Sequence, residues 1–363
     1  MNKSINVSLR MHRTIKYVLL TGIVSILLCQ KASAQCTQSL NSAEDEYESG
    51  RLLDIPSMLA FCLNRNGFSK EEKIRAYKLL TKVYIFSDEE EKAEESLVLL
   101  LKADPEHELN NLFDPAELFY LYNKFRVKPV FRLALKLGAN FSSANVIDEF
   151  STYTFSDGAR EYTSQLGFNA ELTIERHITN GLEIAAGLQY SATKFTVQEE
   201  FVTTDISFTV NETQSWLKVP VFARYNFFYE SNKNFLPYVL GGFSTNLLSA
   251  AQFVDSERRG GTQRSVNGYD LLTDNERNRL NFSLFFGGGL KIRTNRVNFF
   301  TVEARYEAGL LNYVNSEHRF INSASTFGLS YVPDNLSLNF LSVSLGYTHS
   351  IYNPKKKRNA NKQ

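Results

Sequence analysis

The sequence contains little of what metal, redox and nucleic-acid-binding proteins need. It has only 3 cysteines, 5 histidines and 1 tryptophan among 363 residues, and the histidines are scattered, with no partners at metal-ligand spacing. The 40 Lys and Arg residues balance the 39 Asp and Glu residues, which leaves a formal net charge of +1. This balance provides no broad electrostatic attraction to nucleic acid. We therefore predict no metal, no cofactor and no nucleic-acid partner.

Long hydrophobic runs are also absent. The longest, YVLLTGIVSILLC from Tyr17 to Cys29, falls short of the ~20 residues that a helix needs to cross a bilayer. Basic residues precede it and Ala32-Ser33-Ala34 follow it, a pattern typical of a secretory signal peptide. We predict that residues 1–34 are this signal. The alternative is a lipoprotein acylated at Cys36, which Gln35 disfavours at the cleavage site.

Removal of the signal leaves two cysteines, Cys36 and Cys62. An exported protein occupies a compartment in which disulfides form. Two interpretations stay open: a disulfide joins the two residues, or each is a small buried apolar side chain.

Residues 35–126 show the period of helices, with apolar side chains recurring three or four positions apart. The segments SKEE (Ser69–Glu72) and SDEE (Ser87–Glu90) both fit the capping box that opens a helix. Short helices joined by tight turns are typical of a tetratricopeptide-like hairpin array. We predict a small all-α domain of five helices. It is either a protein-docking surface or a bundle that only packs against the rest of the protein.

Residues 127–353 change to a period of two. The clearest case is LNFLSVSLGYTHSIY, in which large apolar side chains alternate with Ser, Gly and Thr from Leu341 to Ile351. Seven earlier segments repeat this alternation, starting near Leu133, Leu166, Leu182, Leu217, Leu236, Leu280 and Phe300.

The links between these segments separate a barrel from a soluble sandwich. Short links after segments two, four and six alternate with long polar links after segments one, three, five and seven, as in outer-membrane barrels. Together with the export signal, they predict an all-β eight-stranded antiparallel transmembrane barrel, preceded by the small all-α helical domain.

Charged residues occupy the phase that faces away from lipid in this barrel. Eight strands enclose an interior that side chains roughly fill, so we expect a network of ion pairs that plugs the lumen. A narrow channel or a loop-based binder of a small solute is the alternative. The network comprises Arg132, Lys136, Glu171, Glu183, Lys218, Arg224, Lys291, Glu303, Arg305 and Glu307.

Glu303 and Glu307 are four apart on one strand and face the lumen together, which is the requirement for acid/base catalysis by paired carboxylates. Because Arg305 lies between them, an ion-pair ladder explains the spacing better. We predict no enzymatic activity.

Four segments resemble one family. They are SWLKVPVFARYNF (Ser215–Phe227), LPYVLGGFS (Leu236–Ser244), FFGGGLKI (Phe285–Ile292) and VEARYEAGL (Val302–Leu310). They are similar to strands of the PorT-like outer-membrane barrels of Bacteroidota, and the resemblance extends from Phe131 to Tyr352. It implies an eight-stranded barrel in the outer membrane and a role in protein secretion to the cell surface, and it brings no catalytic residues.

An even number of strands returns the chain to the side from which it entered the membrane. We therefore expect the helical domain and the C-terminus in the periplasm, the barrel in the lipid bilayer of the outer membrane, and a periplasmic protein partner on the helical domain. Residues 354–363 form a basic tail, which contains Lys355-Lys356-Lys357-Arg358. Such a run is usually a solvated end, with an acidic partner or lipid headgroups as alternatives.

Overall fold

The computed structural model describes residues 34–150, 160–201, 205–228, 234–260, 263–295, 297–321, 324–329 and 331–357. They form two units. The helical unit contains the residues up to Lys128 together with those from Tyr352 onward, and the barrel unit is Pro129–Ile351. The predicted signal peptide lies outside the described residues, except for Ala34.

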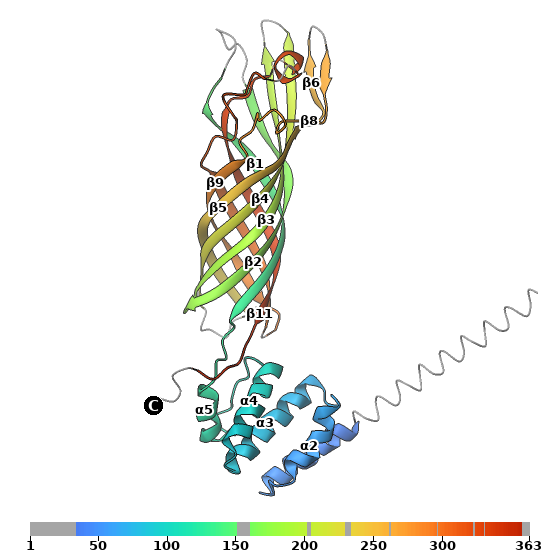
Figure 1. The fold of residues 1–363 in the computed structure, drawn as a ribbon, viewed down its shortest axis with the longest axis vertical. Coiled ribbons are helices and arrows are strands. Elements are labelled where there is room, and N and C mark those ends of the chain that lie inside the picture. Colours follow the sequence, from blue (N-terminus) through green and yellow to red (C-terminus); the bar gives the residue numbers. More distant parts are fainter. Residues whose placement is uncertain are drawn as a thin grey trace, which may run out of the picture. The chain divides into compact units, whose positions relative to one another are not determined.

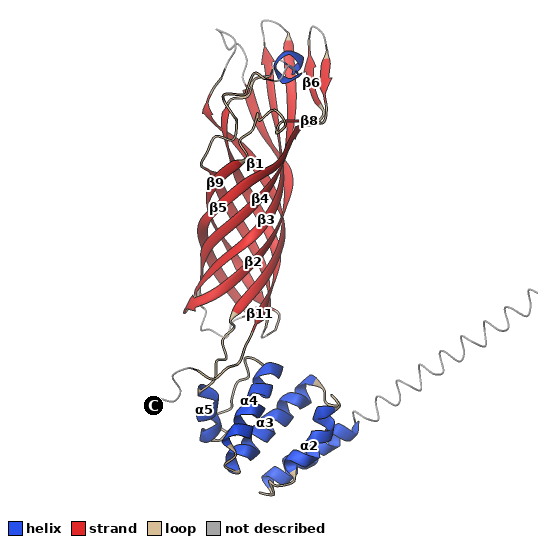
Figure 2. Cartoon of the chain, viewed as in Figure 1, coloured by secondary structure: helices blue, strands red, loops and turns tan. Residues whose placement is uncertain are grey.

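The described part of the helical unit contains five helices, as predicted (Figure 2). A first helix runs through residues 34–48, and four more follow: α2 (Ile55–Asn64), α3 (Lys70–Phe86), α4 (Glu90–Ala103) and α5 (Ala116–Asn123). One apolar core joins the first three helices through Leu40, Leu59 and Leu80. A second lies between α4 and α5, where Leu97 and Leu121 are buried. No helix in the described part of the chain is both long and apolar enough to cross a membrane.

One of the two predicted capping boxes is present. Ser69 accepts a hydrogen bond from the Glu72 amide, and the Glu72 side chain accepts one from the Ser69 amide, so this box starts α3. The box at Ser87 is wrong. Ser87 ends α3, and Asp88 has a positive φ of 57°, so neither residue has the extended backbone of an N-cap. Only three residues separate α3 from α4, so Ser87 cannot both end α3 and cap the N-terminus of α4.

Eight long strands form a closed antiparallel ring, which confirms the predicted barrel (Figure 1). β1 pairs with β11, with Leu137 opposite Leu345, so the C-terminal strand closes the ring against the first. β4 pairs with β5, and the ring therefore has no free edge. Three short strands (β6, Ser256–Arg259; β7, Arg264–Val266; β8, Tyr269–Asp270) extend it. The ring strands are β1 (Phe131–Asp148), β2 (Arg160–Thr179), β3 (Leu182–Phe201), β4 (Ile206–Asn226), β5 (Phe235–Phe253), β9 (Leu280–Arg293), β10 (Asn298–Gly309) and β11 (Asn335–Ile351).

Some strands are longer than the alternating segments of the sequence. The third link was predicted to be long and polar, but β3 continues to Phe201 and β4 begins at Ile206. The residues expected in that loop form paired strands instead, with Val197 opposite Val210. We name the end of the barrel that carries this connection the loop end. The opposite end, where β2 meets β3 between Thr179 and Leu182, is the turn end.

The reason for this difference is that polar and apolar side chains exchange faces along the barrel. Toward the turn end of β3, Leu188 points outward and is exposed, whereas Glu183 points inward and is buried. Toward the loop end the inward side chains become apolar, with Phe195 and Val197 buried, and the outward Gln198 is polar and exposed. An apolar inside and a polar outside is the arrangement of a soluble protein. The outer surface near the loop end therefore suits contact with water, and the outer surface toward the turn end suits contact with lipid.

Candidate functional site

The candidate site is the interior of the barrel. The structure places all ten predicted lumen residues inside the wall, and the most exposed of them, Arg132, keeps only 8 % of its surface. Since an isolated buried charge is costly, each of these side chains requires an opposite partner.

Glu303 on β10 is the centre of the network. Its Oε1 atom lies 3.0 Å from Lys136 Nζ and 2.8 Å from Arg305 Nη2. Its Oε2 atom accepts a hydrogen bond of 2.8 Å from the Tyr238 hydroxyl and lies 3.4 Å from Arg224 Nη2. One carboxylate therefore balances three cations from three other positions in the barrel wall.

Glu171 on β2, separated from β10 by two strands of the ring, adds a second carboxylate to this centre. Lys136 Nζ lies 3.0 Å from Glu171 Oε1, and Arg305 Nη1 lies 2.8 Å from Glu171 Oε2. Lys136 and Arg305 thus each bridge Glu171 and Glu303. Arg305 thus pairs with Glu303, as the spacing predicted, but its second partner is Glu171, and Glu307 pairs with Lys218.

Toward the turn end the network continues through Glu183. Its carboxylate pairs with Arg132 and lies 2.6 Å from Lys291 Nζ. Lys291 also lies 3.4 Å from Glu175, which in turn pairs with Arg224. The ion pairs therefore run continuously from the turn end to the centre.

A second cluster lies on the loop-end side of this centre. Lys218 Nζ lies 2.9 Å from both oxygens of Glu307 and 3.6 Å from the centroid of the Phe340 ring. Ser283 and Asn246 donate hydrogen bonds of 2.6 and 3.1 Å to the same carboxylate. The Glu307 carboxylate is therefore held by side chains from three other strands, β4, β5 and β9.

Two members of the network were missed in the sequence. Glu175 lies two residues after Thr173 on the inward phase of β2, so extending the alternation by one step would have found it. Tyr238 gave no such signal, because the inward residues Leu236, Tyr238 and Leu240 of β5 are all large and blur the pattern. Its ring also explains one glycine: a Cβ atom on Gly289 would lie 2.6 Å from Tyr238.

The loop end contains different contacts. Arg277 approaches Glu212 of β4 in a two-pronged contact, with Nε and Nη2 at 3.0 and 2.7 Å from the two oxygens. Gln214 donates to Glu212 and accepts from Trp216 Nε1 at 2.8 Å. Around this chain of contacts lies an apolar core that includes Tyr331. The interior therefore contains two successive clusters of side chains, one ionic and one largely apolar.

No metal site emerges from the part of the chain that the structure describes. No group of three or more His, Cys, Asp or Glu side chains in it is placed to hold a metal ion.

The helical unit has its own covalent constraint, because the structure joins Cys36 and Cys62 in a disulfide across 26 residues. Closure of a loop of this size is worth ~3–4 kcal/mol in the chain-entropy account. Gly67 lies against the bridge, and a Cβ atom there would approach Cys36 Sγ to 2.6 Å. Any larger residue would therefore displace the disulfide.

Asp114 forms a buried ionic cluster in the same unit. Its two oxygens lie 2.6 Å from Lys78 Nζ and 2.8 Å from Lys82 Nζ, and its side chain has no exposed surface. Burial alone would raise the pKa of Asp114, but the hydrogen bonds from Lys78, Lys82 and the Asn110 amide outweigh it and lower the pKa to about 2. The carboxylate therefore fixes the Asn110–Asp114 loop to α3.

This cluster predicts an acid-sensitive contribution to stability. Because the folded pKa is lower than the ordinary value of 3.8, the contribution is complete above about pH 4 and disappears as the pH falls toward 2. Asp114→Asn should lower the melting temperature of the helical signal at pH 7 by roughly 4–8 °C, on the order of 1 kcal/mol. Circular dichroism melts at several pH values measure this, and the gap between wild type and variant should close by pH 2. A gap that stays constant down to pH 2 would contradict the assignment.

The basic tail contacts the helical unit as far as Lys357, although a run of basic residues is usually solvated. Its backbone pairs antiparallel with the segment that follows α5: the Arg126 amide donates to Lys355 O, and the Lys357 amide donates to Lys124 O. Lys356 Nζ lies 2.6 Å from Glu94 of α4. The residues after Lys357 lie outside the described part of the chain.

A closed antiparallel ring with an apolar outer band, and with charges paired inside, defines a transmembrane barrel of the outer-membrane class. Residues 122–315, more than half of the chain, match the family described as "Outer membrane protein beta-barrel domain". The chain belongs to this family, and the barrel is located in the outer membrane.

Solved structures similar to this chain are outer-membrane barrels too. OprG from Pseudomonas aeruginosa is 10 % identical, with 62 % of this chain and 98 % of that chain covered and a TM-score of 0.37. Neisserial surface protein A is 14 % identical, with 60 % and 97 % covered and a TM-score of 0.31. The outer membrane enzyme PagL is 16 % identical, with 58 % and 99 % covered and a TM-score of 0.24. No curated protein matches the sequence.

Proposed function

We propose that the protein is a non-enzymatic, plugged outer-membrane barrel that holds a helical docking domain in the periplasm, as part of a cell-envelope or protein-secretion assembly. The observation that carries this proposal is that the charges of the barrel interior pair with one another, whereas the helical unit exposes apolar side chains. The charges of the barrel interior are engaged with one another, so the surface left for a partner is that of the helical unit.

The proposed orientation follows from the chain path. The first ring strand begins and the last one ends at the turn end, and both chain ends continue into the helical unit. Outer-membrane barrels have short turns on the periplasmic side and long loops outside. The helical unit, the disulfide and the basic tail would then lie in the periplasm, an oxidising compartment.

Support for docking comes from the surface of the helical unit. Leu112 and Phe113 are adjacent, with 85 % and 78 % of their surfaces exposed, and Leu53 is 93 % exposed. Exposed apolar side chains that cluster are typical of interaction surfaces. The four segments that resemble PorT-like barrels favour a secretion assembly as the setting.

A site-specific crosslinking experiment tests the docking role. A photo-reactive residue at Phe113 in cells of the native host should give one discrete adduct with a second envelope protein. The same probe at Gln198, on the outer surface of the loop end, serves as the control. Failure to form an adduct from Phe113, Leu112 and Leu53 alike would remove the docking domain from the proposal.

The plugged lumen leads to a second prediction. Purified protein in a planar bilayer should show no steady conductance, because the ion pairs around Glu303 and the core around Tyr331 close the interior in series. Substitution of Glu303 and Glu171 by alanine, with Arg277→Ala to release the loop end, should produce measurable openings. Steady conductance of the unmodified protein would instead favour the alternative, a narrow channel.

A further inference from the structure

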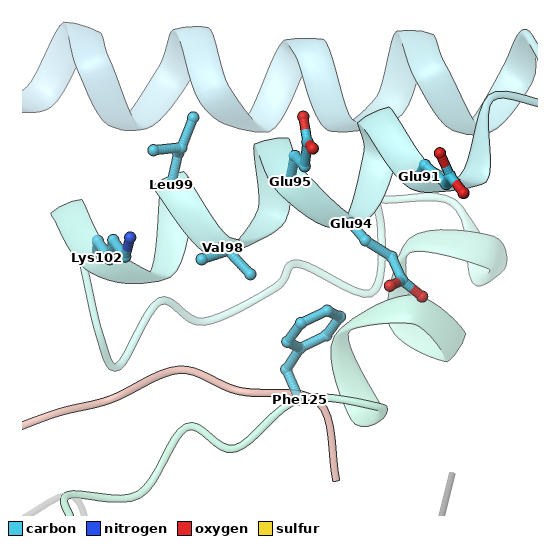
Figure 3. Close-up of a pocket in the computed structure, with 7 residues that line it drawn as sticks. All are labelled: Glu91, Glu94, Glu95, Val98, Leu99, Lys102 and Phe125. Carbon is cyan, nitrogen blue, oxygen red and sulfur yellow. The ribbon is translucent and has the colours of Figure 1, made fainter. Parts of the chain in front are cut away.

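One groove of the helical unit is formed by α4 and the segment after α5. Figure 3 shows Val98 and Glu94 on the side of α4 that faces Phe125, Leu99 and Glu95 on the other side of the helix, and Lys102 at the end of α4 away from Glu91. Its volume is about 550 Å³. The residues that line it are Glu91, Glu94, Glu95, Val98, Leu99, Lys102 and Phe125.

Several of these α4 residues lie outside the buried face of the helix, whereas Val98 also packs against the core. α4 buries Ala93, Leu97, Leu100 and Leu101 against its neighbours, and these define its inner face. Glu91, Glu95, Leu99 and Lys102 recur every three or four positions on another face and are exposed. A stripe with this spacing is the surface along which a further helix packs.

The charge of the groove restricts its occupant. Glu91, Glu94 and Glu95 make one end of the groove acidic, which disfavours acidic peptides and anionic headgroups. Within the described residues, Glu91 and Glu95 have no basic partner. Val98 and Leu99 follow directly, so the occupant must present apolar side chains next to its cations.

A basic segment of this chain already contacts one of the groove glutamates. Lys356 of the tail lies on Glu94, and the tail is fixed by its backbone hydrogen bonds to Lys124 and Arg126. The tail leaves the apolar part unmatched, however, because the residues that follow Lys357 (RNANKQ) contain no side chain larger than alanine among their apolar residues.

We infer that this groove binds a basic amphipathic helix of the partner protein, with apolar side chains on Val98 and Leu99 and with Lys or Arg residues against Glu91 and Glu95. The inference rests on the proposed docking function and specifies the chemistry of the partner. The bound helix would extend the helical array by one member, as the next helix does in a repeat protein.

The test uses the full-length protein in detergent and a fluorescent 18-residue peptide of Leu and Lys with amphipathic helical spacing. Fluorescence anisotropy should show saturable binding that weakens at least tenfold in Leu99→Ser and in Glu91→Lys/Glu95→Lys. The control Glu71→Lys/Glu117→Lys makes the same change in net charge at exposed positions away from the groove and should bind as wild type. A peptide with Glu in place of Lys should not bind.

Equal binding by wild type, the two groove variants and the control would overturn the inference. A variant that ends at Lys357 tests whether the last six residues occupy the groove. A tenfold gain in its affinity for the peptide would show that they do, and would also overturn the inference. Unchanged affinity supports an external helix. Because crosslinking from Phe113 is independent of this groove, the docking proposal can succeed where this inference fails.

Discussion

Glu303→Ala should lower the free energy of unfolding of the barrel by about 3–5 kcal/mol, the cost of leaving buried charges without their partner. The variant removes the carboxylate that balances Lys136, Arg305 and Arg224, all of which are buried in the barrel interior. Glu303→Gln should have an intermediate effect, because the amide keeps an acceptor for Tyr238 while losing the charge.

Urea titration in lipid vesicles measures this effect. The chain has a single tryptophan, Trp216, which is buried at the loop end and reports unfolding by its fluorescence. Val302→Ala is the matched control, since Val302 precedes Glu303 on β10 and points outward. If Glu303→Ala and Val302→Ala shifted the transition equally, the lumen network would not be a stabilising feature.

Leu345→Arg should destabilise the inserted barrel by about 2–4 kcal/mol, the cost of a cation on the lipid face near the midplane. Leu345 lies midway along the apolar outward row of β11, has 64 % of its surface exposed, and pairs with Leu137 and Val302 on the neighbouring strands. Its exposure would be harmless in water, so the cost arises only because lipid surrounds it.

The matched control is Gln198→Arg on the outward face of β3 near the loop end. There the alternation is reversed and the outside is polar, so this arginine should change stability by less than about 0.5 kcal/mol. Folding yield into vesicles and urea titration compare the two variants. Similar costs at both positions would place the loop end inside the hydrocarbon and contradict the boundary drawn from the reversed alternation.

The sequence predicted the barrel well because its strongest signal is periodic and local. Alternation assigned the inward face of β1, β4 and β10 residue by residue, since a strand places successive side chains on opposite faces. It failed where two-residue periodicity remains but changes its meaning, as between Phe195 and Val210. In this segment the polar residues face outward and the apolar residues face inward. A prediction that expects every strand to have an apolar outer face therefore assigns the segment to a loop.

Pairings between distant residues could not be predicted in this way. The inward phase identified Lys136 and Glu303, but their contact depends on the register of β1, β11 and β10 around the closed ring. The same applies to Arg277, which lies in a loop and meets Glu212 only because the chain folds over the mouth of the barrel. Periodicity carries no information on such contacts, because they depend on backbone positions far apart in the chain.

The sequence alone determined that this protein has an eight-stranded barrel and a small helical domain, since these follow from the spacing of apolar residues and the lengths of the links. Only the tertiary structure decided how the interior is filled, which cations share each carboxylate, and that the basic tail joins the helical unit. Local spacing determines which face a side chain takes. Closure of the ring determines which side chains it meets.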